Sequence, residues 1–406
     1  MKLKLSSTNL PLLHRSHLPY ALASCFLGLL FVLPLRAQDS QQQPSQQNSS
    51  QEKAPPAQDS QEKVDVNDVS RTYVVHLPQG YNQQQHYPVV ILLHGRNQDA
   101  GDMARLTHFN QLADKDRIIA VYPNAAHGSW NIGVHPEQVN QGMQPRRGGG
   151  RRGGWGGYPG GGGGYPGGGG GGYPGGGGGG GYPSGGQGGG QNGGENPDQN
   201  RNRPEPPDDV AFLNQMLDQL PLKYSVDTRR IYATGLGDGG FMALRVGCDM
   251  ADRVAAIAPV GAAMPKTMIC LPARAVSALF INGTDDPVVP NNGGTYKPGR
   301  FHVLSAEDSA KTWAKFDHCG DKPAEAKLPA AEKGGKETET YTYSGCQDNA
   351  QVVLYSVKNG GNTWPGGEQY MSEKEVGKTS NALNANDAIW SFLVTKKIAG
   401  ESGIEK

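Results

Sequence analysis

Net charge is the first thing that this sequence lacks. Its 38 Lys and Arg residues balance its 38 Asp and Glu residues, and its isoelectric point is about 7.1. A protein that binds nucleic acid or an acidic membrane through electrostatics needs an excess of basic side chains. The composition therefore gives no case for a nucleic-acid partner, and the Arg-Gly-Gly pieces at 146–153 do not change this expectation.

Long hydrophobic runs are also scarce, and the one that stands out lies near the N-terminus. Lys2 and Lys4 precede an apolar run at 20–35, which is followed by Ala37. This order is typical of a secretory signal, so residues 1–37 are predicted to be a signal peptide and the protein to be secreted, extracellular or periplasmic. An uncleaved anchor is the alternative, because the run is near the shortest length that spans a bilayer. No other membrane association is expected.

Cysteine is rare, with five residues in the chain. Four follow the signal segment, and an even number in an exported protein favours two disulfides, for which three pairings exist. We favour the pairing of nearest neighbours, which joins Cys248 to Cys270 and Cys319 to Cys346. No C-x-x-C spacing and no clustered histidines accompany these residues, so no metal site is predicted.

Glycine, in contrast, is abundant, with 60 residues. Most of them lie at 146–194, where Tyr-Pro pairs interrupt them and an acidic, proline-rich segment follows. So few apolar side chains cannot offset the entropy of ordering the backbone, and residues 135–206 are predicted to be a disordered insertion. The composition of this insertion is equally consistent with a flexible adhesive segment or lid and with a low-complexity expansion that has no function. Residues 38–66, rich in Gln and Ser, are predicted to be a disordered tether.

The remaining sequence alternates between apolar runs and amphipathic segments. Continuous apolar runs such as 87–95 are typical of strands buried on both faces of a parallel sheet. Strands are predicted at 71–77, 87–95, 117–125, 229–235, 253–261, 275–283 and 351–357, and helices at 208–220, 240–249, 304–317 and 384–397. Residues 67–134 and 207–398 are therefore predicted to form one doubly wound, mostly parallel α/β domain. The insertion would leave the carboxyl edge of the sheet, where such domains bind ligands.

One turn is central to the functional argument. Residues 229–245, RRIYATGLGDGGFMALR, run from a strand through a glycine-rich turn into a helix. A G-x-G-x-x-G turn cradles a pyrophosphate, whereas a G-x-S-x-G turn lifts a nucleophile above the sheet. The first reading needs an acidic residue at the end of the next strand, and RVAAIAPVGAA offers none. No dinucleotide and no other cofactor is therefore predicted.

A nucleophile turn of the G-x-S-x-G type also requires an acid, a base and an oxyanion loop, and the chain has positions for all three. Asp286 follows the strand at 275–283, and Asn362 follows the strand at 351–357. Arg96 follows the early strand at 87–95, where an oxyanion loop belongs. The order of turn, acid and base along the chain is that of α/β-hydrolases.

With these segments the chain resembles the secreted polyhydroxybutyrate depolymerase and feruloyl esterase family. The matching segments are LLHG (92–95), SWN (129–131), DDVAF (208–212), YATGLGDGG (232–240), AAIAPVGA (255–262), NGTDDPVVP (282–290) and GNTWPG (361–366). The resemblance implies an α/β-hydrolase fold and a ligand that is an ester-bearing polymer or a surface glycan. It also supports the two disulfides, because such esterases place their bridges at these positions.

The chain departs from this family at two catalytic positions. The family's nucleophilic serine falls on Gly237 and its general-base histidine on Asn362, whereas the acid is kept as Asp286. Without a hydroxyl and an imidazole, the domain is expected to be an inactive pseudo-esterase retained for binding. A weak hydrolase that uses re-sited groups and an adhesive protein that acts through the glycine tract are the alternatives. The sequence indicates no oligomeric state.

Other residues would complete the old cleft. The backbone N–H groups of Arg96 and Asp238 are predicted to form an oxyanion-type anion site. Trp130 and Trp364 are predicted to line the cleft, although either fits the core equally well. Glycine at position 237 would relieve the strain of the turn, because glycine readily adopts backbone conformations that cost other residues about 1–3 kcal/mol.

Overall fold

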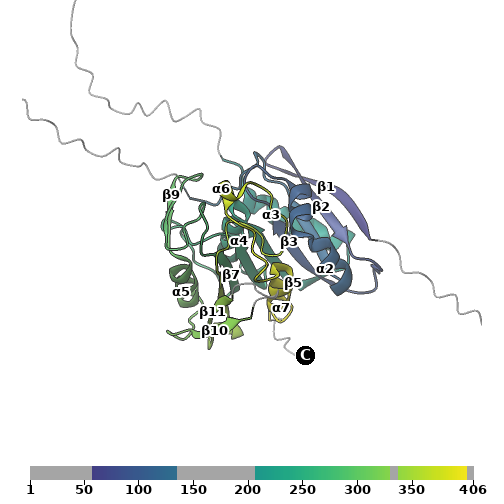
Figure 1. The fold of residues 1–406 in the computed structure, drawn as a ribbon. Helices are drawn as coiled ribbons and strands as arrows, with labels where there is room; N and C mark the ends of the chain where they lie inside the picture. Colours follow the sequence, from purple (N-terminus) through teal and green to yellow (C-terminus); the bar gives the residue numbers. More distant parts are fainter. Residues whose placement is uncertain (1–56, 135–205, 330–336, 400–406) are drawn as a thin grey trace, which may run out of the picture. The chain divides into compact units, whose positions relative to one another are not determined.

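A computed structural model describes residues 57–134, 206–329 and 337–399 (Figure 1). The predicted signal peptide, most of the predicted tether and nearly all of the insertion at 135–206 lie outside these ranges. Across the described ranges no helix combines the length and the apolar character needed to cross a membrane.

The centre of the domain is a ten-stranded sheet in the order β1-β2-β4-β3-β5-β6-β7-β12-β11-β10. Its strands are β1 (Gln58–Val66), β2 (Val69–Leu77), β3 (Tyr87–Leu93), β4 (Ile119–Pro123), β5 (Val226–Leu236), β6 (Ala256–Val260), β7 (Ser277–Gly283), β10 (Ala324–Leu328), β11 (Thr338–Tyr343) and β12 (Val352–Val357). The strands from β4 to β12 in this order run parallel, and antiparallel strands lie at both edges. This order, with the glycine-rich turn after β5, is that of the α/β-hydrolase fold. The predicted fold class is confirmed.

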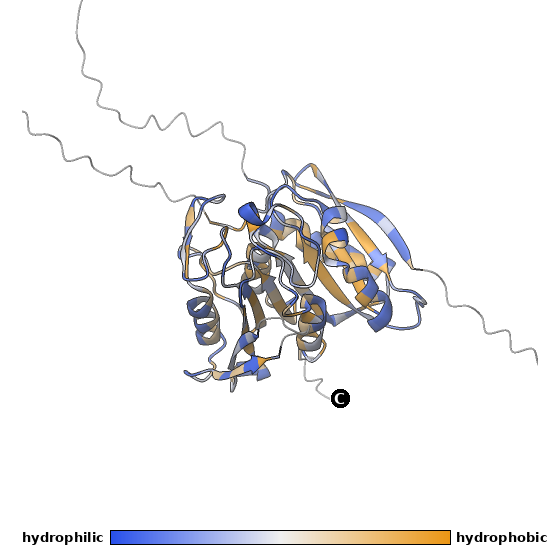
Figure 2. Cartoon of the chain, in the orientation of Figure 1, coloured by the Kyte–Doolittle hydropathy of each residue, from blue (hydrophilic) through white to orange (hydrophobic). Residues whose placement is uncertain are grey.

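Helices cover both faces of the sheet. They are α1 (Ala100–Thr107), α2 (Phe109–Asp116), α3 (Asp209–Lys223), α4 (Asp238–Asp249), α5 (Ala306–Phe316), α6 (Glu373–Val376) and α7 (Ala385–Leu393). Val89 and Ile91 pack in the same core cluster as α3, α4 and α5, whereas Val90 and Leu92 pack with α1, α2 and α7. Alternate side chains of a strand point to opposite faces, so the continuous apolar runs fill two cores. The central strands are coloured as hydrophobic in Figure 2.

The prediction of a disordered tether is wrong for its last residues. Residues 58–66 form β1, which pairs antiparallel with β2 along its whole length. In β1 only Val64 and Val66 are buried. An edge strand gains backbone hydrogen bonds from one neighbour while most of its side chains stay in water, so a polar composition did not exclude it. The sequence also gave no prediction for α1, α2, β10 and β11.

Both predicted disulfides are confirmed. Cys248, near the end of α4, is bonded to Cys270, and Cys319, after α5, is bonded to Cys346. Disulfides of this kind are typical of proteins in oxidising compartments.

Candidate functional site

The turn after β5 keeps the backbone geometry of a nucleophile turn. Gly237 has φ 55° and ψ −114°, in the left-handed half of backbone space that favours glycine. Its N–H donates to the carbonyl oxygen of Val260 at 3.0 Å, and its own carbonyl oxygen accepts from Phe241 at 2.9 Å. Position 237 is therefore held between the end of β6 and the first turn of α4.

The neighbouring glycines let this turn pack closely. A Cβ atom at Gly239 would lie 1.9 Å from the carbonyl oxygen of Leu93, and one at Gly235 would lie 2.5 Å from the backbone of Gly239. Any side chain at either position would push α4 away from β3 and β5. The glycine-rich segment therefore serves helix-to-strand packing at the site.

Asn362 and Asp286 lie in the loops after β12 and β7 and are joined by a hydrogen bond. Nδ2 of Asn362 donates to Oδ2 of Asp286 at 2.8 Å and to the carbonyl oxygen of Gly261 at 2.9 Å. Because both partners are acceptors, the amide can face them only with its nitrogen. The other oxygen of Asp286 accepts from the N–H groups of Val288 and Val289 at 2.8 Å each. Burial raises the pKa of Asp286 to about 6, against the opposing effect of these hydrogen bonds.

Positions 237 and 362 face each other. A Cβ atom at Gly237 would lie 3.0 Å from Oδ1 of Asn362. The structure thus brings together the three positions at which the sequence predicts a nucleophile, a base and an acid. Neither Gly237 nor Asn362 carries a hydroxyl or an imidazole there.

A cavity of about 240 Å³ opens over this turn. It is lined by Gly95, Arg96, Asn97, Gln98, Leu236, Gly237, Asp238, Val288, Tyr296, Pro298, Asn362, Tyr370, Met371, Glu375 and Val376. Tyr370 also fixes the loop of Asn362, because its hydroxyl donates to the carbonyl oxygen of that residue at 3.0 Å. The walls mix aromatic and aliphatic side chains with a few polar groups, as small-molecule sites do.

The side chain of Asp238 is held by three partners. Its carboxylate accepts hydrogen bonds from the hydroxyls of Tyr296 and Ser129, and it pairs with Nε of Arg96 at 3.2 Å. Only 5% of Asp238 is exposed. Its carboxylate oxygens are thus engaged by fixed donors, which argues against a nucleophilic role. Sequence reasoning missed Tyr296 and Ser129, because a short hairpin and a loop carry no periodic signal.

The backbone N–H groups of Arg96 and Asp238 belong to residues that line this cavity. Asp238 is the first residue of α4, where an N–H group has no acceptor within its own helix. Within the described ranges no backbone acceptor is paired with either N–H group. Their joint action on an anion or a carbonyl oxygen stays a prediction.

The two tryptophans differ in position. Trp130 is buried, donates from Nε1 to the carbonyl oxygen of His94 at 2.9 Å, and borders an adjoining cavity of about 110 Å³. Trp364 is only 1% exposed, and its Nε1 donates to Oδ1 of Asn386 at 2.9 Å. It packs in the core on the side of α1 and α7, so the prediction that it lines the cleft is wrong.

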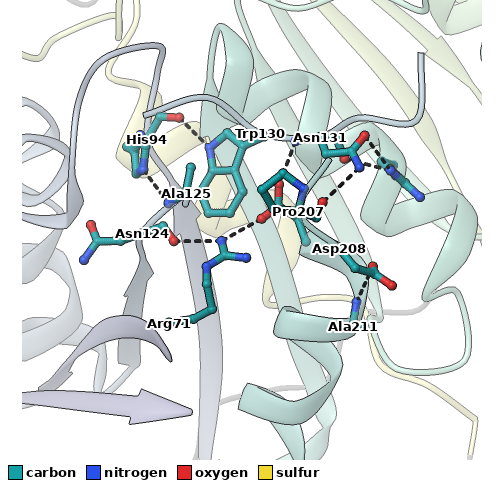
Figure 3. Close-up of polar contacts among 11 residues, drawn as sticks. Arg71, His94, Asn124, Ala125, Trp130, Asn131, Pro207, Asp208 and Ala211 are labelled. Atoms are coloured by element: carbon teal, nitrogen blue, oxygen red, sulfur yellow. Dashed lines mark hydrogen bonds and ion pairs between the residues drawn. The ribbon is translucent and has the colours of Figure 1, made fainter. Parts of the chain in front are cut away.

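The histidine nearest to the turn is structural. Nδ1 of His94 donates to the carbonyl oxygen of Gly95 at 2.7 Å. Nε2 accepts from the N–H of Ala125 at 3.0 Å (Figure 3). Burial lowers the pKa of His94. Both ring nitrogens are used, so this imidazole is not placed to accept a proton from a ligand.

A hydroxyl–histidine pair does occur on the small hairpin of β8 (Gly294–Tyr296) and β9 (Phe301–Val303). Oγ1 of Thr295 lies 3.1 Å from Nδ1 of His302, and both side chains are exposed. Because successive residues of a strand face opposite ways, Thr295 points away from the cavity that its neighbour Tyr296 lines.

The two chain segments that flank the insertion are bonded to each other (Figure 3). Nδ2 of Asn131 donates to the carbonyl oxygen of Pro207 at 2.9 Å, and its N–H donates to Asp209 at 2.6 Å. Asp209 forms a buried ion pair with Arg71 at 2.6 Å, and Arg245 donates to the carbonyl oxygen of Asn131 at 2.7 Å. We call this network the insertion clamp.

A larger cavity of about 790 Å³ lies beside the insertion clamp and is lined partly by Arg71, Asn131 and Pro207. The cavity over Gly237 is the candidate site, because both Gly237 and Asn362 line it. In the described part of the chain, no group of three or more His, Cys, Asp or Glu side chains is placed to hold a metal ion.

Comparisons with known proteins point to esterases. No protein-family model matches the chain. It is 31% identical over 209 residues to the putative esterase NocK of Nocardia uniformis subsp. tsuyamanensis, which covers 49% of this chain and 61% of that protein. It is 34% identical over 163 residues to feruloyl esterase B of Piromyces equi, covering 38% of this chain and 28% of that protein. The chain therefore spans less than two thirds of the length of either relative.

Among solved structures, a thermostable esterase is similar at 13% identity and a TM-score of 0.42, covering 84% of this chain and 64% of that chain. An acetyl xylan esterase from Aspergillus awamori is similar at 12% identity and a TM-score of 0.43, covering 75% and 94%. These TM-scores are low, so the fold assignment rests on the strand order and the relatives in sequence. The chain is an esterase-like α/β-hydrolase.

Proposed function

We propose that this protein is an exported pseudo-esterase of the polyhydroxybutyrate depolymerase and feruloyl esterase type. It retains the hydrolase cleft for binding an ester-bearing polymer or a surface glycan and does not cleave it. The observation that carries the proposal is the pairing of Gly237 with Asn362: an intact turn presents no oxygen, and the residue facing it has no imidazole.

The chemistry of acyl transfer supports this proposal. An ester is attacked by a nucleophile whose proton passes to a nearby base. The amide oxygen of Asn362 does not take up a proton near neutral pH. Asp286 is buried, accepts three hydrogen bonds and is not among the residues that line the cavity. In a well-studied serine hydrolase, loss of triad members lowers kcat by about a millionfold.

The parts of the site that serve binding are kept. The cavity over Gly237 has aromatic and aliphatic walls, and two residues that line it, Arg96 and Asp238, have backbone N–H groups with no backbone acceptor in the described ranges. The named activities of the relatives, which include a feruloyl esterase, favour a polymer with esterified groups as the ligand class. The two disulfides suit a protein that works outside the reducing cytoplasm.

A turnover assay on the purified whole protein tests the inactivity. With p-nitrophenyl butyrate we expect a rate equal to that of buffer for the wild-type protein and for the Asp286→Ala variant. Turnover that Asp286→Ala abolishes and the neighbouring exposed Asp285→Ala keeps would establish a working hydrolase. Turnover that Thr295→Val abolishes instead would assign catalysis to the Thr295–His302 pair.

A depletion assay tests the binding. We expect the protein to be depleted from solution by insoluble feruloylated arabinoxylan or by polyhydroxybutyrate granules, and a protein that binds neither would contradict the proposal. A variant with residues 135–205 replaced by a short Gly-Ser linker should bind equally well. Loss of binding in this variant would instead favour an adhesive protein that acts through the glycine tract.

A further inference from the structure

The side-chain oxygen of Asn362 is an acceptor on a mostly buried residue that lines the cavity. Both hydrogen bonds from Nδ2 are used, one to Asp286 and one to Gly261. Only 3% of Asn362 is exposed, and no described residue donates to its Oδ1. This oxygen faces the place where a Cβ atom at Gly237 would lie, at 3.0 Å, and both residues line the cavity.

We propose that the space above Gly237 selects ligands that carry a hydrogen-bond donor next to a carbonyl oxygen, as a primary carboxamide does, over esters and carboxylates. This inference goes beyond the proposed function, because an ester group would bind in this space more weakly than a carboxamide does, and it rests on the proposed binding role of the cavity. The carbonyl oxygen of such a ligand would accept from the N–H groups of Arg96 and Asp238. Its NH₂ group would donate to Oδ1 of Asn362.

An ester offers no donor, so once bound it would shield this oxygen from water without replacing the hydrogen bond, which weakens binding by about tenfold or more. A carboxylate also lacks a donor and brings a negative charge. The charged side chains that line the cavity are Arg96, Asp238 and Glu375, and Arg96 is already paired with Asp238. The remaining charge is negative, so the cavity favours a neutral ligand over an anion.

The walls define the rest of the ligand. Tyr296, Tyr370, Val288 and Pro298 surround a volume of about 240 Å³, which suits a flat apolar group attached to the carbonyl carbon. Benzamide combines such a group with a primary carboxamide. Methyl benzoate, sodium benzoate and N,N-dimethylbenzamide keep the ring and lack the donor.

Titration calorimetry of the whole protein with these four probes is the test. We expect benzamide to bind at least about tenfold more tightly than each of the other three. In Gly237→Ser the serine hydroxyl would lie beside Oδ1 of Asn362 and donate to it in place of the ligand's NH₂ group. The preference for benzamide over the other three probes should therefore fall below about threefold. Gly237→Ala, which fills the space without a donor, should weaken all four probes.

Equal binding of the four probes, no binding of benzamide at millimolar concentration, or a preference that survives Gly237→Ser would overturn the inference. None of these outcomes depends on ester cleavage. Turnover of p-nitrophenyl butyrate together with a benzamide preference would overturn only the proposed inactivity. Absence of both turnover and preference would overturn only the ligand selection.

Discussion

Asn362 donates from Nδ2 to Asp286 at 2.8 Å and turns its oxygen toward Gly237. Asn362 therefore still lies between the acid, Asp286, and the turn at Gly237, although its amide cannot relay a proton. The arrangement keeps the spatial order of a triad without its chemistry. It also makes the consequences of restoring each member predictable.

The first prediction concerns restoration of the two missing groups. In Gly237→Ser with Asn362→His, Nδ1 of the imidazole can donate to Asp286 while Nε2 faces the serine hydroxyl. We expect this double variant to hydrolyse p-nitrophenyl butyrate at least about a hundredfold faster than the wild-type protein. Each single variant should stay at the wild-type rate. A double variant that folds, as judged by circular dichroism, and stays silent would show that the cleft itself no longer binds esters productively.

The second prediction concerns the structural role of Asp286. Asp286→Ala leaves the N–H groups of Val288 and Val289 without their acceptor and removes one partner of Asn362. Unsatisfied buried donors cost about 1–3 kcal/mol each, so we expect a loss of about 3 kcal/mol in the free energy of unfolding. The exposed neighbour provides the matched control, because Asp285→Ala should change stability by less than about 0.5 kcal/mol in urea denaturation. Equal losses in both variants would refute this role.

The third prediction concerns Asp317, which is fully buried after α5. Its Oδ1 accepts from the N–H of Val276 at 3.0 Å, and its Oδ2 has no partner within the described ranges. Burial raises the pKa of Asp317 well above that of an ordinary aspartate, to about 7. The folded state therefore keeps this proton over a range in which the unfolded state has lost it, so stability falls as pH rises from about 4 to about 7.

The Asp317→Asn variant lacks this titration. From pH 4 to pH 8 its stability relative to the wild-type protein should rise, by at most about 4 kcal/mol. Urea denaturation of both proteins at a series of pH values checks this. Parallel pH profiles would mean that Asp317 titrates near its usual pKa in the folded state.

The fourth prediction concerns the bridge between α4 and the loop before β7. Cys248 and Cys270 are 22 residues apart, and a crosslink over a loop of this size stabilises a protein by about 3 kcal/mol. The Cys248→Ala, Cys270→Ala double variant should lose about that much in the free energy of unfolding. A variant as stable as the wild-type protein under oxidising conditions would show that the bridge contributes little.

Much of the fold could be predicted because its strands are continuous apolar runs in a regular order. The three site positions could be predicted because they follow the parallel strands β5, β7 and β12, and parallel strands end at the same edge of the sheet. Other features depend on tertiary contacts. Tyr296 reaches Asp238 only once the hairpin of β8 and β9 folds over the turn.

The errors have physical causes as well. β1 is polar because it is an edge strand, and its backbone pairing is invisible in composition. Trp364 lies two residues after Asn362, yet its side chain packs in the core cluster that contains residues of α1, α2 and α7. Nearness in sequence did not reveal which side of the loop each residue occupies.

The insertion clamp bears on how such a chain can change over generations. Asn131 and Pro207 hold the two flanking segments together, so the intervening stretch is attached to the domain at nearly a single point. Because these two anchors are hydrogen-bonded to each other, a gain or loss of residues between them would not require Gly237 or Asn362 to move. The fold can thus accept abrupt length mutations at this point while selection continues to act on the cleft separately.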